Sequence, residues 1–147
     1  MKLKIKKLSD NAVIPKRATE KSAGYDLSAC LTEPLTIEPH AIAKVPTGIS
    51  AELVSECDAV LLIYARSSLA TKFGVTLANC VGVVDSDYRG EIIVAMINHS
   101  DKPYTVSHGD RIAQLVISPV LLPDVEEAQE LSDTARGQGG FGSTGKA

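Results

Sequence analysis

Short aliphatic and β-branched segments recur along this chain, each closed by a turn, and they constrain the fold more than any other feature. They cover residues 35–37, 41–45, 49–53, 59–64, 104–106 and 111–117. Glycine, proline, asparagine and aspartate stand between them, and only residues 69–73 suggest a helix. Many short strands at close spacing predict an all-β sandwich or jelly roll with one short helix.

The size and charge of the chain exclude several functions. Its 147 residues and 44% hydrophobic content are enough for one domain with a sizeable core. A net charge of -3 argues against general binding of nucleic acid, which needs a cationic face. No apolar run has transmembrane length, so we expect no membrane association. Three distant cysteines indicate free thiols in a reducing compartment, and we expect the cytoplasm.

The richest stretch in functional groups is residues 79–94. Two apolar runs flank a polar turn, which predicts a β-hairpin. Asp87 is explained as a turn residue that hydrogen-bonds its own backbone. Asp85 differs, because it stands at the end of the apolar strand. It is either a base beside a semi-buried floor or an ordinary turn aspartate, and the pattern leaves both readings open.

A second polar group follows the apolar run at 59–64. Ser67 or Ser68 can cap a short helix, and Gly74 can end it. With Arg66, these hydroxyls could bind one phosphate, although a plain cap with a solvated arginine explains the pattern equally well. Gln114 lies among apolar residues of a predicted strand. A buried amide needs partners, so it could serve a site or a subunit contact.

The composition changes near residue 123. We therefore expect a core at 1–122 and a flexible, glycine-rich C-terminal arm at 123–147. The arm has an arginine, Arg136, before its glycines, one aromatic residue, Phe141, and the hydroxyls of Ser143 and Thr144. Glycines let main-chain N–H groups approach phosphate, and an aromatic ring can stack on a base. The arm could thus become ordered over a ligand, although it lacks the Walker A pattern.

Five motifs in this order and spacing resemble the homotrimeric dUTP diphosphatase (dUTPase) family. They are Ala-Gly-Tyr-Asp-Leu at 23–27, Ala-Arg-Ser-Ser-Leu-Ala at 65–70, Gly-Val-Val-Asp-Ser-Asp-Tyr-Arg-Gly at 82–90, Gly-Asp-Arg-Ile-Ala-Gln at 109–114 and Arg-Gly-Gln-Gly-Gly-Phe-Gly-Ser-Thr-Gly at 136–145. The third and fifth are highly specific, and the set spans nearly the whole chain.

The resemblance implies a distorted jelly-roll subunit, β-clip-like, in a homotrimer with three active sites shared between subunits. It implies hydrolysis of dUTP to dUMP and pyrophosphate by Mg²⁺-assisted attack of water on the α-phosphate. That reaction keeps uracil out of DNA and supplies dUMP for thymidylate synthesis. One subunit would supply residues 79–94, a second Arg66 and its serines, and the third its arm.

The resemblance also assigns a role to each candidate residue. Asp85 would accept the 3′-hydroxyl and orient the attacking water, and Tyr88 would pack beneath the deoxyribose. Asn79, with the main chain near Val83, Val84 and Ile93, would read the uracil edge. The phosphates and the water would be held by Arg66, Ser67, Ser68 and Gln114. Arg136, Ser143 and Thr144 would bind the γ-phosphate, Phe141 would stack on the base, and Asp26 would touch the water shell of Mg²⁺.

Two other functions are compatible with this fold. Ser68 stands where the family usually has glycine, and Arg-Ser-Ser is typical of the related dCTP deaminases. Those enzymes also carry a second arginine where this chain has Thr71, and a glutamate where it has Ala95. A non-catalytic trimeric nucleotide-binding module is the other alternative. Such a module would be expected to lose Asp85 or the arm, and this chain retains both.

Overall fold

The computed structural model describes residues 1–140, which are mostly β with a single α-helix. The strands are β1 (Lys2–Lys7), β2 (Lys16–Arg17), β3 (Tyr25–Ser28), β4 (Leu35–Ile37), β5 (Ile42–Pro46), β6 (Ile49–Val54), β7 (Ala59–Ala65), β8 (Val75–Leu77), β9 (Gly82–Val84), β10 (Ile93–Asn98), β11 (Tyr104–Val106) and β12 (Arg111–Pro119), and α1 is Ser67–Phe73.

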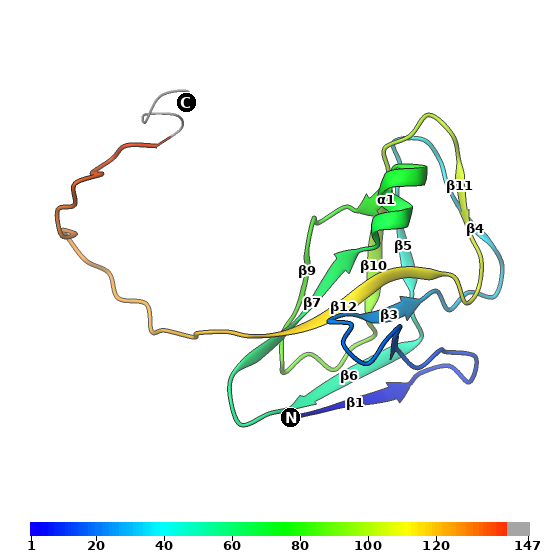
Figure 1. Ribbon diagram of the computed structural model, residues 1–147, viewed down its shortest axis with the longest axis horizontal. Coiled ribbons are helices and arrows are strands. Elements are labelled where there is room, and N and C mark those ends of the chain that lie inside the picture. The colour runs from blue at the N-terminus through cyan, green and yellow to red at the C-terminus, as the bar shows by residue number, and fades with distance from the viewer. Residues whose placement is uncertain (141–147) are drawn as a thin grey trace.

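The strands form four small sheets around one core. The largest has the order β2-β3-β12-β7-β9, and a second has the order β5-β10-β8. Two-stranded ribbons, β1-β6 and β11-β4, lie at opposite sides of the body, while α1 lies at one end of it (Figure 1). All of the pairings among the described residues are antiparallel, and most join strands that are far apart in the sequence. The predicted jelly-roll-like, all-β fold is confirmed.

The core is built from aliphatic side chains, as expected for a chain without tryptophan. The largest side chains that are fully buried include Leu27, Ile37, Ile49, Ile92, Met96, Ile112 and Leu115. They come from strands of both larger sheets and of the ribbons, and, in the case of Ile92, from the residue just before β10, so one core holds the sheets together. Burial of this apolar surface is the main force that stabilises the subunit.

Local sequence signals explain both ends of α1. Gly74 adopts the left-handed conformation, with φ of 67°, and its N–H donates to the carbonyls of Leu69 and Ala70. The predicted glycine stop is therefore confirmed. The predicted serine cap is wrong. The helix already begins at Ser67, so the capping position falls on Arg66, whose side chain makes no cap hydrogen bond.

The predicted β-hairpin at 79–94 is also wrong in its pairing. β9 pairs with β7, and β10 pairs with β5 and β8, so the two runs belong to different sheets. They are joined by residues 85–92, called here the 85–92 loop. β9 adds to the largest sheet beside β7, and β10 lies between β5 and β8. Pairing within larger sheets satisfies more main-chain groups than a two-stranded ribbon does. The runs are left apart, with a hollow between them.

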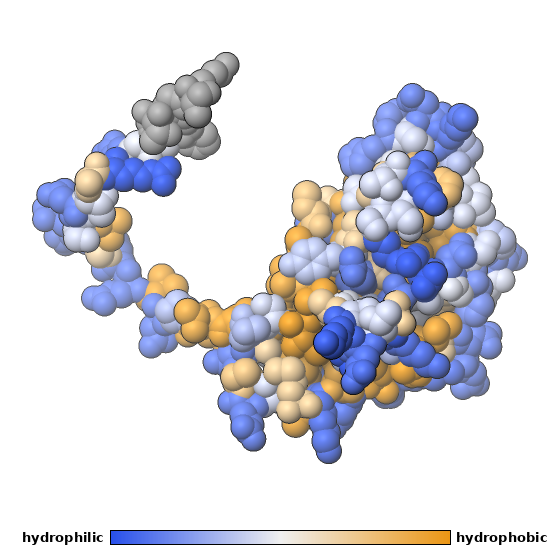
Figure 2. Space-filling model, in the orientation of Figure 1, coloured by the Kyte–Doolittle hydropathy of each residue, from blue (hydrophilic) through white to orange (hydrophobic). Residues whose placement is uncertain are grey.

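Beyond β12 the chain leaves the body. Residues 120–140 form no helix or strand and extend away from the sheets (Figure 1). Leu121 is 93% exposed and Val125 is 98% exposed, and apolar side chains are visible where the extension begins (Figure 2). Apolar side chains at this exposure have no contact in their own subunit that would shield them from water. Within residues 1–140, no helix is long and apolar enough to cross a membrane.

Candidate active site

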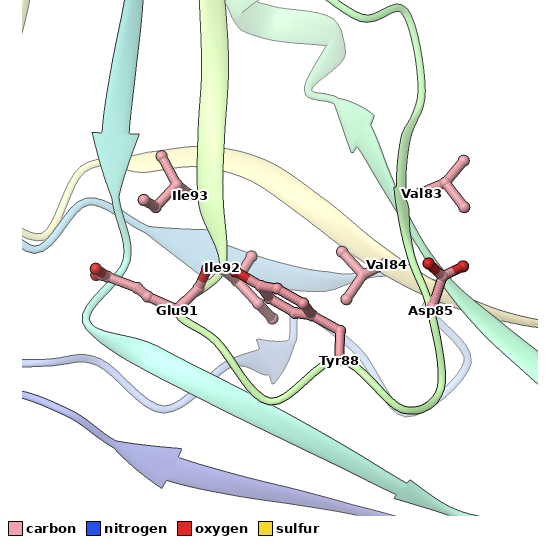
Figure 3. Close-up of a pocket in the computed structure, with 7 residues that line it drawn as sticks. All are labelled: Val83, Val84, Asp85, Tyr88, Glu91, Ile92 and Ile93. Carbon is pink, nitrogen blue, oxygen red and sulfur yellow. Dashed lines mark hydrogen bonds between the residues drawn. The ribbon is translucent and has the colours of Figure 1, made fainter.

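The first part of the candidate site is the hollow between β9 and β10, with a volume of about 230 Å³. It is lined by Val83, Val84, Asp85, Tyr88, Glu91, Ile92 and Ile93 (Figure 3). β9 is the last strand of its sheet, and β8 pairs only with residues 96–98 of β10. The start of β10 and the outer side of β9 can therefore keep main-chain groups that no neighbouring strand uses. A planar ligand could therefore bind these groups much as another strand would.

Hydrogen bonds fix the 85–92 loop, which carries Asp85 and Tyr88. The N–H of Tyr88 donates to the carbonyl of Asp85 at 3.1 Å, which closes the predicted turn. The Arg89 guanidinium donates to the carbonyls of Ser86 and Tyr88. The Tyr88 hydroxyl donates to the carbonyl of Glu91 at 3.0 Å. The ring thus crosses the mouth of the loop, with Val84 between it and the Asp85 carboxylate (Figure 3).

The second part is a polar hollow of about 370 Å³ on another face of the subunit. Its lining includes Asp26, Arg66, Ser67, Ser68 and Gln114. These residues come from β3, from the start of α1 and from β12, and the pairing of β12 with β3 and β7 brings them together. A cation, two hydroxyls and an amide around one hollow suit an anionic ligand.

Asp26 joins two arginines in this hollow. Its Oδ1 lies 3.1 Å from Nε of Arg66 and its Oδ2 lies 3.1 Å from an Nη of Arg111. Arg66 also donates to the Arg111 carbonyl at 3.1 Å. The Asp26 and Arg66 side chains are only 21% and 23% exposed, so their attraction is less screened than that of surface pairs. Asp26 therefore holds the Arg66 guanidinium in place, and half-exposed Arg111 is an additional cation that the sequence pattern had not singled out.

Gln114 has the partner that a polar residue in an apolar strand requires. Its Nε2 donates to the Ala65 carbonyl at 3.0 Å. Gly24 lies against the other side of the amide. A Cβ atom at Gly24 would lie 2.5 Å from Oε1 of Gln114, closer than two such atoms can approach. The Ala-Gly-Tyr-Asp motif thus needs glycine so that the Gln114 amide can occupy this hollow.

The two hollows share no lining residue, and β7 sets the distance between them. Val84 pairs with Leu61 near the start of β7, whereas Arg66 follows its last residue. Five residues of extended chain place these two points about 17 Å apart, at about 3.3 Å per residue. One subunit therefore does not bring Asp85 and Arg66 to the same phosphate.

Comparison with known proteins identifies the family. The dUTPase family model matches residues 10–145, almost the entire length. This chain belongs to the dUTPase family. Among curated relatives, the deoxyuridine 5′-triphosphate nucleotidohydrolase of Desulfitobacterium hafniense is 52% identical over 90% of this chain and 87% of the relative. The enzyme of the same name from Nautilia profundicola is 48% identical over 99% of this chain and 100% of the relative.

Solved structures of dUTPases have the same fold. The dUTPase of Staphylococcus bacteriophage 80alpha with dUpNHpp matches with a TM-score of 0.86 and 28% identity over 99% of both chains. A dUTPase mutant from phage phi11 of S. aureus, described with a structural Mg(II) ion, matches with a TM-score of 0.79. It covers 90% of this chain and all of its own length, but its 23% identity supports the fold alone.

Two other candidate residues, Asn79 and Arg136, line neither hollow. Arg136 lies on the extension, where its Nε donates to the Gly139 carbonyl at 2.9 Å. Asn79 is exposed beside β9, and its Nδ2 would lie 3.5 Å from a Cβ atom at Gly82. Phe141, Ser143 and Thr144 lie outside the described residues. A single subunit of this dUTPase family member therefore carries the motifs in separate places.

The described residues contain no cluster of three or more histidine, cysteine, aspartate or glutamate side chains that could hold a metal ion. This does not conflict with the Mg²⁺ expected from the sequence. Mg²⁺ keeps several waters and is commonly bound by one or two carboxylates together with substrate phosphates. Asp26 is the carboxylate of the polar hollow, but both of its oxygens are bound to arginines. This residue therefore fits only a contact through water with an ion that arrives on the substrate.

The ion pairs of Asp26 lead to a prediction. Asp26→Asn should raise KM for dUTP about tenfold, with a smaller change in kcat, because Arg66 loses a charge-assisted partner but keeps its bond to the Arg111 carbonyl. Steady-state kinetics would measure the change. Asp101→Asn is the matched control, since Asp101 pairs with His40 on the exposed surface. Equal kinetics for wild type and Asp26→Asn would contradict this role.

Proposed function

We propose that this chain hydrolyses dUTP to dUMP and pyrophosphate, the reaction after which its relatives are named. The observation that carries the proposal is the hollow between β9 and β10, with Asp85 and Tyr88 at its border. Uracil is planar and needs a specific set of donors and acceptors along one edge. Main-chain groups near Val83, Val84 and Ile93 that point away from the paired strands can offer that set, with the Asn79 amide nearby.

In this arrangement the base enters between the strands and the sugar meets Tyr88. The ring would pack against the deoxyribose and leave no room for a 2′-hydroxyl. Asp85 would accept a hydrogen bond from the 3′-hydroxyl and orient the water that attacks the α-phosphorus. A carboxylate that both positions a nucleophilic water and accepts its proton combines proximity with general base catalysis.

The phosphates would be bound by a neighbouring subunit. Since Leu61, which pairs with Val84 next to Asp85, lies about 17 Å from Arg66 along β7, a complete site would need Arg66, Ser67, Ser68 and Gln114 from a second copy. A closed homotrimer provides three such pairs by symmetry. The exposed apolar side chains on the extension, among them Leu121 and Val125, would be covered by such contacts.

The arm would complete the site from the third subunit. Residues 123–147 would close over the bound nucleotide, with Arg136, Ser143 and Thr144 on the γ-phosphate and Phe141 on the base. An arm that extends from its own body can reach another copy without disturbing the core. Closure would also exclude water other than the one held by Asp85, which strengthens each charge interaction inside the site.

Magnesium would reach the site with the triphosphate. When bound, Mg²⁺ neutralises charge that develops on the phosphate oxygens. Asp26 would contact it only through its water shell, and the arginines Arg66 and Arg136 would supply further positive charge from the protein. The three cysteines are free thiols, as is usual in a reducing compartment, so we place the enzyme in the cytoplasm, where it would limit uracil in DNA and supply dUMP.

The test is pyrophosphate release from dUTP, dCTP, dTTP and UTP, each measured separately with magnesium. We expect rapid release from dUTP and rates at least a hundredfold lower with the other three. dCTP would leave the polar groups that bind the uracil edge unpaired, dTTP adds a 5-methyl group to the base, and UTP carries the 2′-hydroxyl that Tyr88 would exclude. Ammonia release from dCTP would indicate a deaminase instead. Binding of dUTP without turnover would indicate the non-catalytic module.

A further inference from the structure

Glu91 contacts both the Tyr88 side chain and a distant turn of the core. Its main-chain carbonyl accepts the Tyr88 hydroxyl at 3.0 Å, and its Oε1 accepts the N–H of Gly48 at 2.7 Å. The side chain is half-buried and lines both the hollow beside Tyr88 and a separate hollow near Cys30. Its carboxylate points away from Asp85, on the far side of Tyr88 (Figure 3). It therefore does not point toward the proposed reaction centre.

The Gly48 amide is a firm anchor for this carboxylate. Gly48 has φ of 67° in the turn between β5 and β6, and its carbonyl accepts the N–H of Leu8 at 2.7 Å. The turn is also tightly packed, since a Cβ atom at Gly48 would lie 2.7 Å from Sγ of Cys30 and 2.9 Å from Cβ of Ala12. A hydrogen bond to this amide therefore ties Glu91 to a part of the subunit that has little freedom to move.

The position of the Tyr88 ring depends on the main chain that Glu91 fixes. The ring lies against Gly90, where a Cβ atom would be 2.3 Å from the hydroxyl oxygen. Its hydroxyl is bound to the next residue, Glu91. Residues 88–91 belong to no strand, so strand pairing does not hold them. The first main-chain hydrogen bond to a strand after this segment is at Ile92, whose N–H donates to the carbonyl of Ile49 in β6.

The carboxylate has no competing role in the described part of the chain. The Glu91 carboxylate forms no ion pair there, and the Gly48 amide is the one hydrogen-bond partner of this carboxylate. A carboxylate that accepts a main-chain N–H forms a charge-assisted bond, stronger than one between neutral groups. This hydrogen bond can therefore hold the 85–92 loop against the core, which a carboxylate bound only to water could not do.

We propose that Glu91 is a positioning residue for sugar selection. The hydrogen bond from the Gly48 amide to the Glu91 carboxylate holds the main chain at residues 90–91 in place. This main chain in turn fixes how closely the Tyr88 ring approaches the sugar. The inference rests on the proposed function, in which that ring excludes a 2′-hydroxyl. A shift of about 1 Å in such a contact is enough to loosen a site. Loss of the bond should therefore admit ribose, rather than simply weaken the fold.

Two variants separate the bond from the charge. Glu91→Asp keeps the charge but is one methylene shorter, so the carboxylate no longer reaches the Gly48 amide. Glu91→Gln keeps the acceptor oxygen at the same reach but removes the charge. The ratio of kcat/KM for dUTP to kcat/KM for UTP is the readout. We expect this ratio to fall about tenfold in Glu91→Asp, mainly through better use of UTP, and to stay within about threefold of wild type in Glu91→Gln.

Glu33→Ala, which removes an exposed carboxylate, is the control and should leave the ratio unchanged. Thermal melting and size measurement of each variant would report on the fold. An unchanged ratio in Glu91→Asp, or an equal loss for dUTP and UTP, overturns the positioning role while leaving the proposed function intact. If the wild-type protein released no pyrophosphate from dUTP, the proposed function itself would fail, and this inference with it.

Discussion

Asp85→Asn should lower kcat for dUTP by about 10²- to 10⁴-fold, the usual contribution of a general base. Asparagine has nearly the same shape and can still bond to a 3′-hydroxyl, but it cannot accept a proton from water. KM should therefore change much less than kcat. Single-turnover pyrophosphate release, together with binding of a non-hydrolysable analogue, would separate the two effects.

Asp87→Asn is the matched control for this experiment. Asp87 lies in the same turn and is exposed, but it does not line the hollow between β9 and β10. We expect its kinetics to stay close to wild type. Turnover by Asp85→Asn at a near wild-type rate would exclude Asp85 as the base.

Mixing two inactive variants should restore activity, the second large effect that we expect. Asp85→Asn and Arg66→Ala each inactivate a different part of the site, and the two parts lie about 17 Å apart along β7. If each site takes Asp85 from one subunit and Arg66 from another, an equal mixture that has exchanged subunits regains about a quarter of wild-type activity. Coexpression of two tagged chains would give such trimers.

The reciprocal mixture provides the control. When the double variant Asp85→Asn with Arg66→Ala is mixed equally with wild type, shared sites again predict about a quarter of the activity, because both residues must come from wild-type chains. Sites contained in one chain would instead give about half of the activity, and no recovery in the first mixture. Failure of the first mixture to regain activity, despite proven exchange, would rule out the shared site.

Much of the fold followed from local sequence patterns. In β1, lysines alternate with aliphatic residues, a pattern typical of a strand with one exposed face, and its lysines are indeed exposed while Leu3 and Ile5 are half-buried. Gly74 ended α1 in the predicted way, because a left-handed residue after a helix depends on only a few neighbouring residues. The predicted serine cap was wrong, because α1 begins at Ser67 and the capping position therefore falls on Arg66.

The pairing of strands did not follow from those patterns. β9 and β10 look like the two strands of a hairpin in the sequence, yet each pairs with strands of another sheet. Register and partner choice depend on how the entire core packs, and the spacing along the chain carries little information about this. The resulting gap is the feature that makes a binding hollow possible.

The sequence by itself determined which chemical groups this protein has, their order and the family to which they belong. Only the tertiary structure showed that Asp26 forms ion pairs with Arg66 and Arg111, and that the Glu91 carboxylate accepts a hydrogen bond from Gly48. It also showed that β7 separates Asp85 from Arg66. The physical reason is that motifs are local, whereas these contacts join residues far apart in the chain. Such contacts form only when the strands have paired in the folded protein.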